Sequence, residues 1–526
     1  MCKKMISILL TGVLLLGVLS ACTTEEKAEI GIDLSAVEDL EGELCAKEPL
    51  NLTIHMHNGG FGAFDNEKWT IYHDAAKRTN ISLTGTVSTS VSDGAMAYNL
   101  MLLEETLPDI IFHTSGATLN DAGMNEGILI PIEDYVTNEE IMPNLAKIYK
   151  EHPEYLAAIT AADGHVYYCP KIREPGPTQV WFVRTDWQKK LGLKNPTNFD
   201  EFVATMDAIR NGDPNGNGKK DECAYFGKLE HLFYLFGLNG FRYFDVNAED
   251  KFYTPVTSDA YKQALITIAD WYKKGYIDQE IYTRKDPKTE LWGTNTGAMT
   301  VNWVASTMSY NQNIKNIPGF RVDVIAPPEN INGDMYCHTP GSTVTTVGWG
   351  ISKDNQHIAE TLKYFDFWYS EAGSLLNAMG VEGRDFYYDE NGNEQYTELA
   401  MTYDGGAAAY VRTIGCHEIG YYMRQKWLDA GMEESGAAAL KMYQNDIRTC
   451  DLVPLVNFTV DEQKVYDKKW TDCKTYIDEY QQNVILGNVD VEATWDEYLA
   501  QLKKFGCDEV VDLHNTAYER YKKLVK

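Results

Sequence analysis

The sequence predicts an α/β protein, because short apolar segments typical of strands alternate with segments of helical periodicity. Residues 50–57 alternate apolar and polar side chains with the period of a strand, and the loop sequence Asn58-Gly59-Gly60 follows. Residues 107–112 and 180–183 are short apolar runs, as expected of buried parallel strands. Residues 196–209 begin with a cap-like Pro-Thr-Asn segment and then place apolar side chains on one helical face.

Composition and charge exclude several classes of protein. The chain has 526 residues, with 47 Lys and Arg against 77 Asp and Glu, so the formal net charge is −30. A nucleic-acid-binding protein needs a basic surface, which this balance does not favour. A hydrophobic content of 44% and an aromatic content of 12% exclude a disordered chain.

The N-terminus has the pattern of an export signal. Lys3 and Lys4 precede an uncharged apolar run of 13 residues at 6–18, which is shorter than the ~20 residues that span a bilayer. The sequence Leu19-Ser20-Ala21-Cys22 then resembles the lipobox of bacterial lipoproteins. This resemblance implies that residues 1–21 are removed as a signal peptide and that Cys22 is acylated, which anchors the protein at the extracellular face of the cell membrane. The alternative is a plain secretory signal.

The segment that follows is strongly acidic. Residues 23–48 contain nine acidic side chains and two lysines, with little apolar periodicity. We therefore expect residues 22–48 to form a lipidated, flexible tether between the membrane and the folded body.

The cysteines do not define a metal site or a redox motif. None of the ten forms a Cys-x-x-Cys pair, so zinc-ribbon and thioredoxin-like proteins are not indicated. An exported protein can form disulfides, but the spacing specifies no pairing, and buried free thiols are the alternative. Apart from Cys2 and Cys22 the cysteines are Cys45, Cys169, Cys223, Cys337, Cys416, Cys450, Cys473 and Cys507.

Eight short motifs follow one another from residue 107 to the C-terminal region. They are Leu107-Pro108-Asp109-Ile110, the segments 163–168 and 180–187, Leu191-Gly192-Leu193, the segments 213–222 and 380–383, Trp495-Asp496-Glu497-Tyr498 and Ala517-Tyr518-Glu519-Arg520. Each is weakly specific alone, but eight in order are specific. Together they resemble the family 1 extracellular solute-binding proteins of ABC importers, above all the large lipoprotein subgroup that includes alginate-binding proteins. Tyr168 and Cys169 depart from that family's usual residues, which we expect to alter the pocket.

The resemblance implies a two-lobe periplasmic-binding-protein-like fold of type II, with a mixed sheet flanked by helices in each lobe and hinge crossovers between the lobes. We expect residues 49–170 and 338–385 in the first lobe, and residues 171–337 and 386–526, with C-terminal helices, in the second. The implied function is to capture an oligosaccharide by hinge closure and deliver it to the permease subunits of an ABC transporter. A peptide or another small solute, or a surface glycan-binding lipoprotein without an importer, are the alternatives.

The segment 213–222 predicts a structural calcium site. Oxygen-bearing side chains at positions 1, 3 and 5, glycine at 6, a main-chain carbonyl at 7 and an acid at 9 follow the order of an EF-hand loop. Position 12 is Ala224, and the pattern of the alginate-binding relatives implies that the acid at position 10 takes its place. A Gly- and Asn-rich turn without an ion is the alternative. The predicted Ca²⁺ ligands are Asp213, Asn215, Asn217, Lys219 through its carbonyl, Asp221 and Glu222.

A sugar site needs aromatic side chains that stack on C–H faces, together with planar polar groups that bind hydroxyls. We expect such residues in Gly-rich segments and at strand ends that face the cleft, although core packing is the alternative for each. The predicted ligand-binding residues are Asn58, His113, Tyr168, Trp303, Trp349, Glu382 and Arg384.

An enzyme is not expected. The sequence contains no Gly-x-Ser-x-Gly, His-Glu-x-x-His or Walker A motif, and acid pairs carry no information among 77 acids. His55 and His57 share one strand face, which fits a half-solvated strand better than a metal site. We expect a monomer that does not bind nucleic acid and meets the membrane only through its lipid anchor.

Overall fold

The computed structural model describes residues 32–526, apart from short gaps at 60–61, 175, 177–178, 239–242, 305, 307–309, 338–342, 417–418, 431–433, 447 and 450–452. The predicted signal peptide and Cys22 lie outside the described residues. No helix of the described part is long and apolar enough to cross a bilayer.

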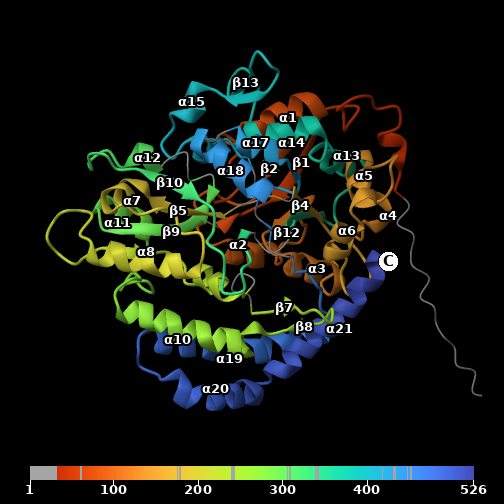
Figure 1. The fold of residues 1–526 in the computed structure, drawn as a ribbon. Helices are drawn as coiled ribbons and strands as arrows, with labels where there is room; N and C mark the ends of the chain where they lie inside the picture. The colour runs from red at the N-terminus through yellow and green to blue at the C-terminus, as the bar shows by residue number, and fades with distance from the viewer. Residues whose placement is uncertain are drawn as a thin grey trace, which may run out of the picture.

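Two mixed β-sheets define two lobes (Figure 1). The first sheet has six strands in the order β15-β4-β12-β3-β1-β2, and the second has four in the order β10-β5-β9-β6. In the first sheet β1 is parallel to β2 and β3, whereas β12 is antiparallel to β3 and β4. The strands of the first sheet are β1 (Leu50–His55), β2 (Ile81–Gly85), β3 (Ile110–His113), β4 (Cys169–Arg173), β12 (Val344–Ile351) and β15 (Tyr422–Met423); those of the second are β5 (Gln179–Arg184), β6 (Cys223–Tyr225), β9 (Gly297–Trp303) and β10 (Val322–Ile325).

The first lobe buries its sheet beneath helices from two parts of the chain. The apolar side chains that alternate along β1, such as Leu52 and Ile54, are fully buried in this core. Its helices are α1 (Ile71–Thr79), α2 (Gly94–Met101), α3 (Gly116–Met124), α4 (Glu133–Val136), α5 (Pro143–Glu151), α6 (Pro153–Ile159), α13 (Ile358–Phe367), α14 (Glu371–Met379), α15 (Glu398–Met401), α16 (Ala407–Thr413) and α17 (Gln425–Asp429), and the hairpin β13 (Phe386–Tyr388) with β14 (Glu394–Tyr396) projects from it.

The second lobe combines its sheet with a group of C-terminal helices. The predicted helix near residue 199 is confirmed as α8, and the side chain of Asn198 caps it by accepting a hydrogen bond from the amide of Glu201 at 3.0 Å. The helices are α7 (Thr185–Leu191), α8 (Phe199–Asn211), α9 (Glu230–Phe233), α10 (Asp259–Lys273), α11 (Pro287–Gly293), α12 (Tyr310–Asn313), α18 (Glu434–Asp446), α19 (Val460–Ile485), α20 (Val491–Phe505) and α21 (Cys507–Val525); the short strand pairs are β7 (Asp245–Val246) with β8 (Phe252–Tyr253) and β11 (Tyr336–Cys337) with β16 (Arg448–Thr449).

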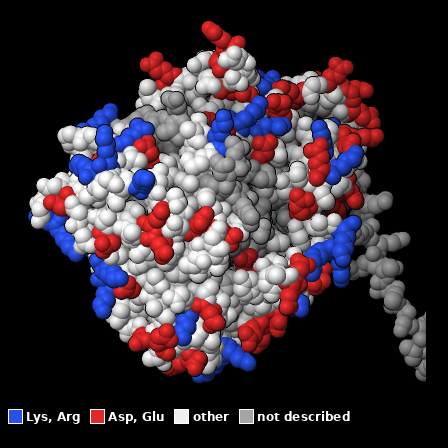
Figure 2. Space-filling model, in the orientation of Figure 1, with Lys and Arg blue, Asp and Glu red and all other residues white. Residues whose placement is uncertain are grey.

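The acidic composition is visible on the surface. Figure 2 shows acidic side chains gathered along the lower edge of one face, over α20 and α21, with basic side chains between them.

Helix α21 connects the two lobes. It packs against α19 and α20 of the second lobe and against α6 of the first lobe.

The lobe boundaries differ from those predicted. β4 stays in the first sheet up to Arg173, and β5 begins the second sheet at Gln179, so the first crossing comes after the predicted boundary between residues 170 and 171. Residues 386–423, predicted in the second lobe, pack in the first, because β15 pairs with β4 and side chains such as Val411 are buried in the first core. The chain then crosses again, and Tyr443 of α18 is buried in the second lobe.

The predicted tether is shorter than expected. Val37, Cys45 and Ala46 are buried against the first lobe. The amide of Cys45 donates a hydrogen bond to the carbonyl of Thr79 at 2.9 Å, and the side-chain amide of Asn80 donates to the carbonyl of Ala46 at 3.1 Å. Small apolar side chains within this acidic segment therefore fold it onto the body, which charge counting alone does not reveal.

A buried carboxylate joins two helices of the first lobe and supports a stability prediction. Asp366 of α13 accepts hydrogen bonds from the amides of Asn144 and Leu145, in the first turn of α5, at 3.0 and 2.9 Å. Burial raises its pKa to about 6, and these hydrogen bonds oppose the rise. Asp366→Ala leaves both amides without an acceptor, so we expect it to lower the free energy of unfolding by about 3 kcal/mol in urea titrations at pH 7.5. Glu151→Ala, at the exposed end of α5, is the matched control and is expected to change it by less than about 0.5 kcal/mol; equal effects would contradict this role of Asp366.

Candidate functional site

A cavity of about 390 Å³ opens beside the end of β9 in the second lobe. Its walls come from β5, β9, the loops before α9 and α11, and the first turns of α9 and α11. The lining side chains that matter here are Gln179, Lys228, His231, Lys288, Asn302 and Trp303.

Trp303 is the aromatic residue of this cavity. The ten other tryptophans are all buried, whereas 44% of Trp303 is exposed. Its ring faces the guanidinium of Arg173, with 5.9 Å between the guanidinium carbon and the ring centroid. Because Arg173 ends β4 and Trp303 ends β9, the cavity lies where the chain passes from the first sheet to the second.

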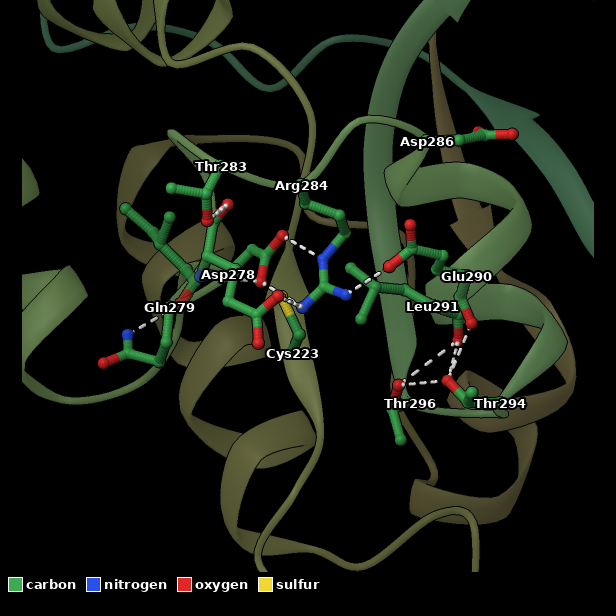
Figure 3. Close-up of polar contacts among 12 residues, drawn as sticks. Cys223, Asp278, Gln279, Thr283, Arg284, Asp286, Glu290, Leu291, Thr294 and Thr296 are labelled. Carbon is green, nitrogen blue, oxygen red and sulfur yellow. Dashed lines mark hydrogen bonds and ion pairs between the residues drawn. The ribbon is translucent and has the colours of Figure 1, made fainter.

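An ion-pair cluster builds the wall of the cavity. Arg284 donates from Nε to Asp278 at 2.8 Å and from Nη1 to Glu290 at 2.7 Å. Figure 3 shows the guanidinium held between these two carboxylates, while Asp286 points away from it. The hydrogen bonds from Arg284 to Asp278, above all, raise the pKa of the guanidinium. Arg284 is thus committed to positioning the loop before α11.

Two lysines of the cavity lack such partners. Among the described residues, no carboxylate lies within 4.0 Å of the ammonium of Lys228 or Lys288. Burial lowers the pKa of Lys288, the nearby charge of Lys228 lowers it further, and Asp286 opposes the shift. The cavity therefore offers ammonium donors, carboxylate acceptors and an aromatic face within one recess.

Two of the predicted ligand-binding residues lie in the core of the first lobe. Trp349 is fully buried, with its ring stacked on Phe365 at a centroid distance of 4.5 Å. Tyr168 is also buried and packs against Gly116 and Gly348, where a Cβ atom would collide with its ring. The glycines next to Trp349 therefore belong to a strand that makes room for neighbouring side chains, and the structure places neither aromatic residue on a surface.

Asn58 and His113 lie at the same edge of the first sheet. Asn58 follows strand β1, and His113 is the last residue of strand β3, which is parallel to β1. Both side chains are half-buried. His113 accepts a hydrogen bond at Nδ1 from the amide of Ser115 at 3.0 Å, and burial lowers the pKa of its ring. This edge is where ligands bind in open α/β sheets, so both residues stay predictions for ligand contact.

Glu382 and Arg384 lie elsewhere. Both are exposed and precede β13, which Figure 1 shows at the top of the first lobe, away from β9. Arg384 donates from Nη2 to Asp385 at 2.7 Å and from Nη1 to Asp74 of α1 at 3.4 Å. These contacts assign Arg384 to holding the hairpin against the lobe, and the structure does not bring it together with Trp303.

Several cavity residues were not predicted. Lys228 and His231 come from the segment at the start of α9 and Lys288 from the first turn of α11, and only the fold brings these two segments together. One local signal exists, because Asn302 immediately precedes Trp303 at the end of a strand-like run. The charged sequence before the proline that begins α11 is a second signal of an exposed, functional loop.

The predicted calcium loop folds as a compact turn of oxygen-bearing side chains. Asp213 accepts hydrogen bonds from the amides of Asn217 and Gly218, both at 3.0 Å. Asn215 and Asn217 each donate a side-chain hydrogen bond to Asp221. Asp213, Gly216 and Gly218 adopt positive φ angles of 47°, 73° and 73°, which curl the loop around its own side chains.

The surroundings of Glu222 indicate whether this loop can bind a cation. The residue is fully buried, and neither carboxylate oxygen has a hydrogen-bond partner of good geometry. Burial raises its pKa most, the charges of Asp221 and Asp213 add to this, and the nearby amides of Glu222 itself and Asn215 oppose it. In the described part of the chain no three His, Cys, Asp or Glu side chains form a metal-binding group. The loop instead mixes carboxylate and amide oxygens, and an unpaired buried carboxylate beside two others fits a hard cation.

Comparison with protein families identifies the chain. The family model for bacterial extracellular solute-binding proteins matches residues 75–374, which is more than half of the chain. The protein belongs to this family. A second model, for a domain of unknown function, matches residues 454–523 in the C-terminal helices.

The relatives of this solute-binding protein include transport proteins for oligosaccharides. The fructooligosaccharide ABC transporter substrate-binding protein FusA of Streptococcus pneumoniae is 26% identical over 96% of each chain. The crystal structure of FusA with kestose has a TM-score of 0.71 at 25% identity and covers 90% of this chain and 99% of that one. The lipoprotein LipO of Bacillus subtilis is 23% identical over 73% of this chain and 77% of its own.

A solved alginate-binding protein is similar over nearly the whole chain. AlgQ2, crystallised without calcium ion, has a TM-score of 0.77 at 29% identity and covers 91% of this chain and 100% of that one. The predicted two-lobe fold and family membership are thus confirmed. The family consists of extracellular binding proteins, which is the class to which this chain is assigned.

Proposed function

We propose that this solute-binding protein captures an oligosaccharide between its lobes and delivers it to the permease of an ABC importer. The exposed ring of Trp303, in a recess lined by polar side chains beside an interlobe crossing, carries the proposal. The ligands in the names of FusA and AlgQ2 support the choice of an oligosaccharide.

The cavity has the chemistry that a sugar requires. The face of Trp303 stacks on the C–H face of a sugar ring, and Asn302, Lys288 and Asp286 offer donors and acceptors to its hydroxyls. A volume of about 390 Å³ accommodates one or two sugar rings, and a longer ligand extends toward Asn58 and His113 across the cleft.

Capture proceeds by hinge closure. The chain crosses between the sheets between Arg173 and Gln179, again before β12, and again between Met423 and α18. A ligand that contacts both lobes shifts the population toward the closed form, and the permease recognises that form. No covalent step is involved, because the protein acts by binding and release.

A calcium ion stabilises the second lobe in this proposal. Asp213, Asn215, Asn217, Asp221, Glu222 and the carbonyl of Lys219 hold it, and its charge neutralises the buried carboxylate of Glu222. The loop joins α8 to β6 and does not line the cavity, so the ion is structural.

The family and the N-terminal sequence support a lipid-anchored, extracellular location. The family is extracellular, and a relative is named a lipoprotein. Acylation of Cys22 then anchors a monomer at the outer face of the cell membrane, where the permease is within reach.

A ligand screen tests the function. Purified protein is melted with neutral oligosaccharides, uronate oligosaccharides and a peptide library, each at several concentrations. A ligand at a hundredfold excess over its Kd adds about 2.7 kcal/mol, so we expect at least one oligosaccharide to raise the melting temperature by several degrees. Stabilisation by peptides alone, or by none of these compounds, would refute oligosaccharide capture.

A further inference from the structure

Two buried thiols lie at the junction of the C-terminal helices. Cys473 is in the middle of α19, and Cys507 is the first residue of α21. They are 0% and 2% exposed, and both belong to the core of the second lobe. The 33 intervening residues contain the whole of α20.

Neighbouring contacts fix the register between these helices. Lys469, Cys473 and Tyr476 are spaced four and three residues apart and so share one face of α19. The ring of Phe505 meets that of Tyr476 at a centroid distance of 5.5 Å. On the other side, Lys469 pairs with Glu509 at 2.7 Å. The chain that enters α21 therefore crosses this face with Cys507 opposite Cys473.

The pair differs from three other buried cysteines. Cys45, Cys223 and Cys416 direct their thiols to main-chain carbonyl oxygens. By contrast, the side chains of Cys473 and Cys507 interact with each other, and this interaction lowers the pKa of Cys473 while burial opposes the shift. The two buried thiols of this pair therefore face each other.

We propose that Cys473 and Cys507 form a disulfide bond in the exported protein. Oxidation removes one hydrogen from each thiol, and the two electrons and two protons reduce the disulfide of an extracytoplasmic thiol–disulfide oxidoreductase to two thiols. The thiolate of Cys473 attacks that disulfide, and the thiol of Cys507 then displaces the carrier from the mixed disulfide. Because both sulfurs are sealed in the folded core, the exchange takes place before α21 docks on α19.

The bond has a consequence for the arrangement of the lobes. It fixes the start of α21 to α19, and the rest of α21 packs against α6 of the first lobe. Arg520 of α21 also donates from Nη1 to Glu462, in the first turn of α19, at 2.8 Å. The disulfide therefore secures one end of a helix whose other end contacts the opposite lobe, and it restricts the unfolded chain.

Peptide mapping tests the bond directly. The purified full-length protein is reduced and unfolded in guanidinium chloride and refolded with reduced and oxidised glutathione, because both thiols are inaccessible in the folded core. Its remaining thiols are then alkylated with N-ethylmaleimide in denaturant, and it is digested with trypsin without reductant. We expect the peptides Trp470–Lys474 and Phe505–Arg520 to be recovered joined, and separated after dithiothreitol. Recovery of both peptides in alkylated form, or joined to other cysteines, would overturn the proposal.

Variants provide a second measurement. The melting temperature of the oxidised protein is expected to exceed that of the reduced protein by several degrees. This difference shrinks in Cys473→Ser and Cys507→Ser but persists in Cys416→Ser, which removes a buried thiol of the first lobe. An undiminished difference in both pair variants would refute the bond. Neither measurement depends on which solute the protein captures.

Discussion

Replacing Trp303 by alanine will weaken oligosaccharide binding by about 30-fold or more, which corresponds to ~2 kcal/mol for a central aromatic contact. The ring of Trp303 is the exposed aromatic face of the cavity. A sugar ring leaves water to stack its C–H face on this ring, and in the variant that face has no replacement partner in the cavity. Isothermal titration calorimetry with the oligosaccharide found by the ligand screen measures the loss.

Two further variants make this test specific. Trp303→Phe keeps a smaller aromatic face and is expected to lose only part of the affinity. Tyr387→Ala removes an equally exposed aromatic ring from β13 and is expected to bind as the wild type does. Because 44% of Trp303 is exposed, its removal should leave the melting temperature of the ligand-free protein nearly unchanged. Unchanged affinity in Trp303→Ala would exclude this cavity as the sugar site.

Local periodicity was sufficient to predict the elements that build the lobes. The alternating segment at 50–57, the apolar runs at 107–112 and 180–183 and the capped helix near 199 correspond to β1, β3, β5 and α8. Their identity is set by side chains only a few residues apart. The allocation of 386–423 was not predictable in this way, because β15 has only two residues and joins a sheet edge determined by distant strands.

The residues of the candidate site also fall into those that the local sequence predicts and those that it does not. Trp303 could be predicted because it ends an apolar run that becomes β9. Trp349 was predicted as a cleft residue from its flanking glycines and Tyr168 from its place near the lobe boundary, yet both are buried. Glycine also occurs inside strands where another ring needs space. The charged residues of the cavity are joined only by tertiary structure, since Lys228 and Lys288 lie sixty residues apart in sequence.

Removal of calcium will lower the melting temperature at pH 7.5 by roughly 5 °C, as expected for an ion that contributes a few kcal/mol. Without the ion, the buried carboxylate of Glu222 stays beside Asp213 and Asp221 with no partner for either oxygen. Differential scanning calorimetry in EDTA, with calcium restored in excess, measures the change. An identical melting temperature in both conditions would show that the loop binds no stabilising ion.

The variant Glu222→Gln distinguishes the stabilisation by the ion from the effect of the buried charge that the ion neutralises. The variant cannot supply the anionic ligand, so we expect its calcium affinity to fall at least tenfold and its response to EDTA to disappear. Its ion-free melting temperature should equal or exceed that of ion-free wild type, because an unpaired buried charge has been removed. Glu249→Gln, at an exposed acid of the second lobe, is the control and should retain the full response.

The calcium effect will also depend on pH, with a sign set by Glu222. Its pKa is raised in the ion-free folded protein, so the folded state binds a proton more readily than the unfolded state does. Ion-free stability therefore rises as pH falls through that raised pKa, whereas calcium must displace the same proton and binds more weakly. The melting curves with calcium and with EDTA should be far apart at pH 7.5 and converge toward pH 5. Curves that stay equally separated would place the ion on groups other than Glu222, and in Glu222→Gln the pH-dependent part of the separation should be absent.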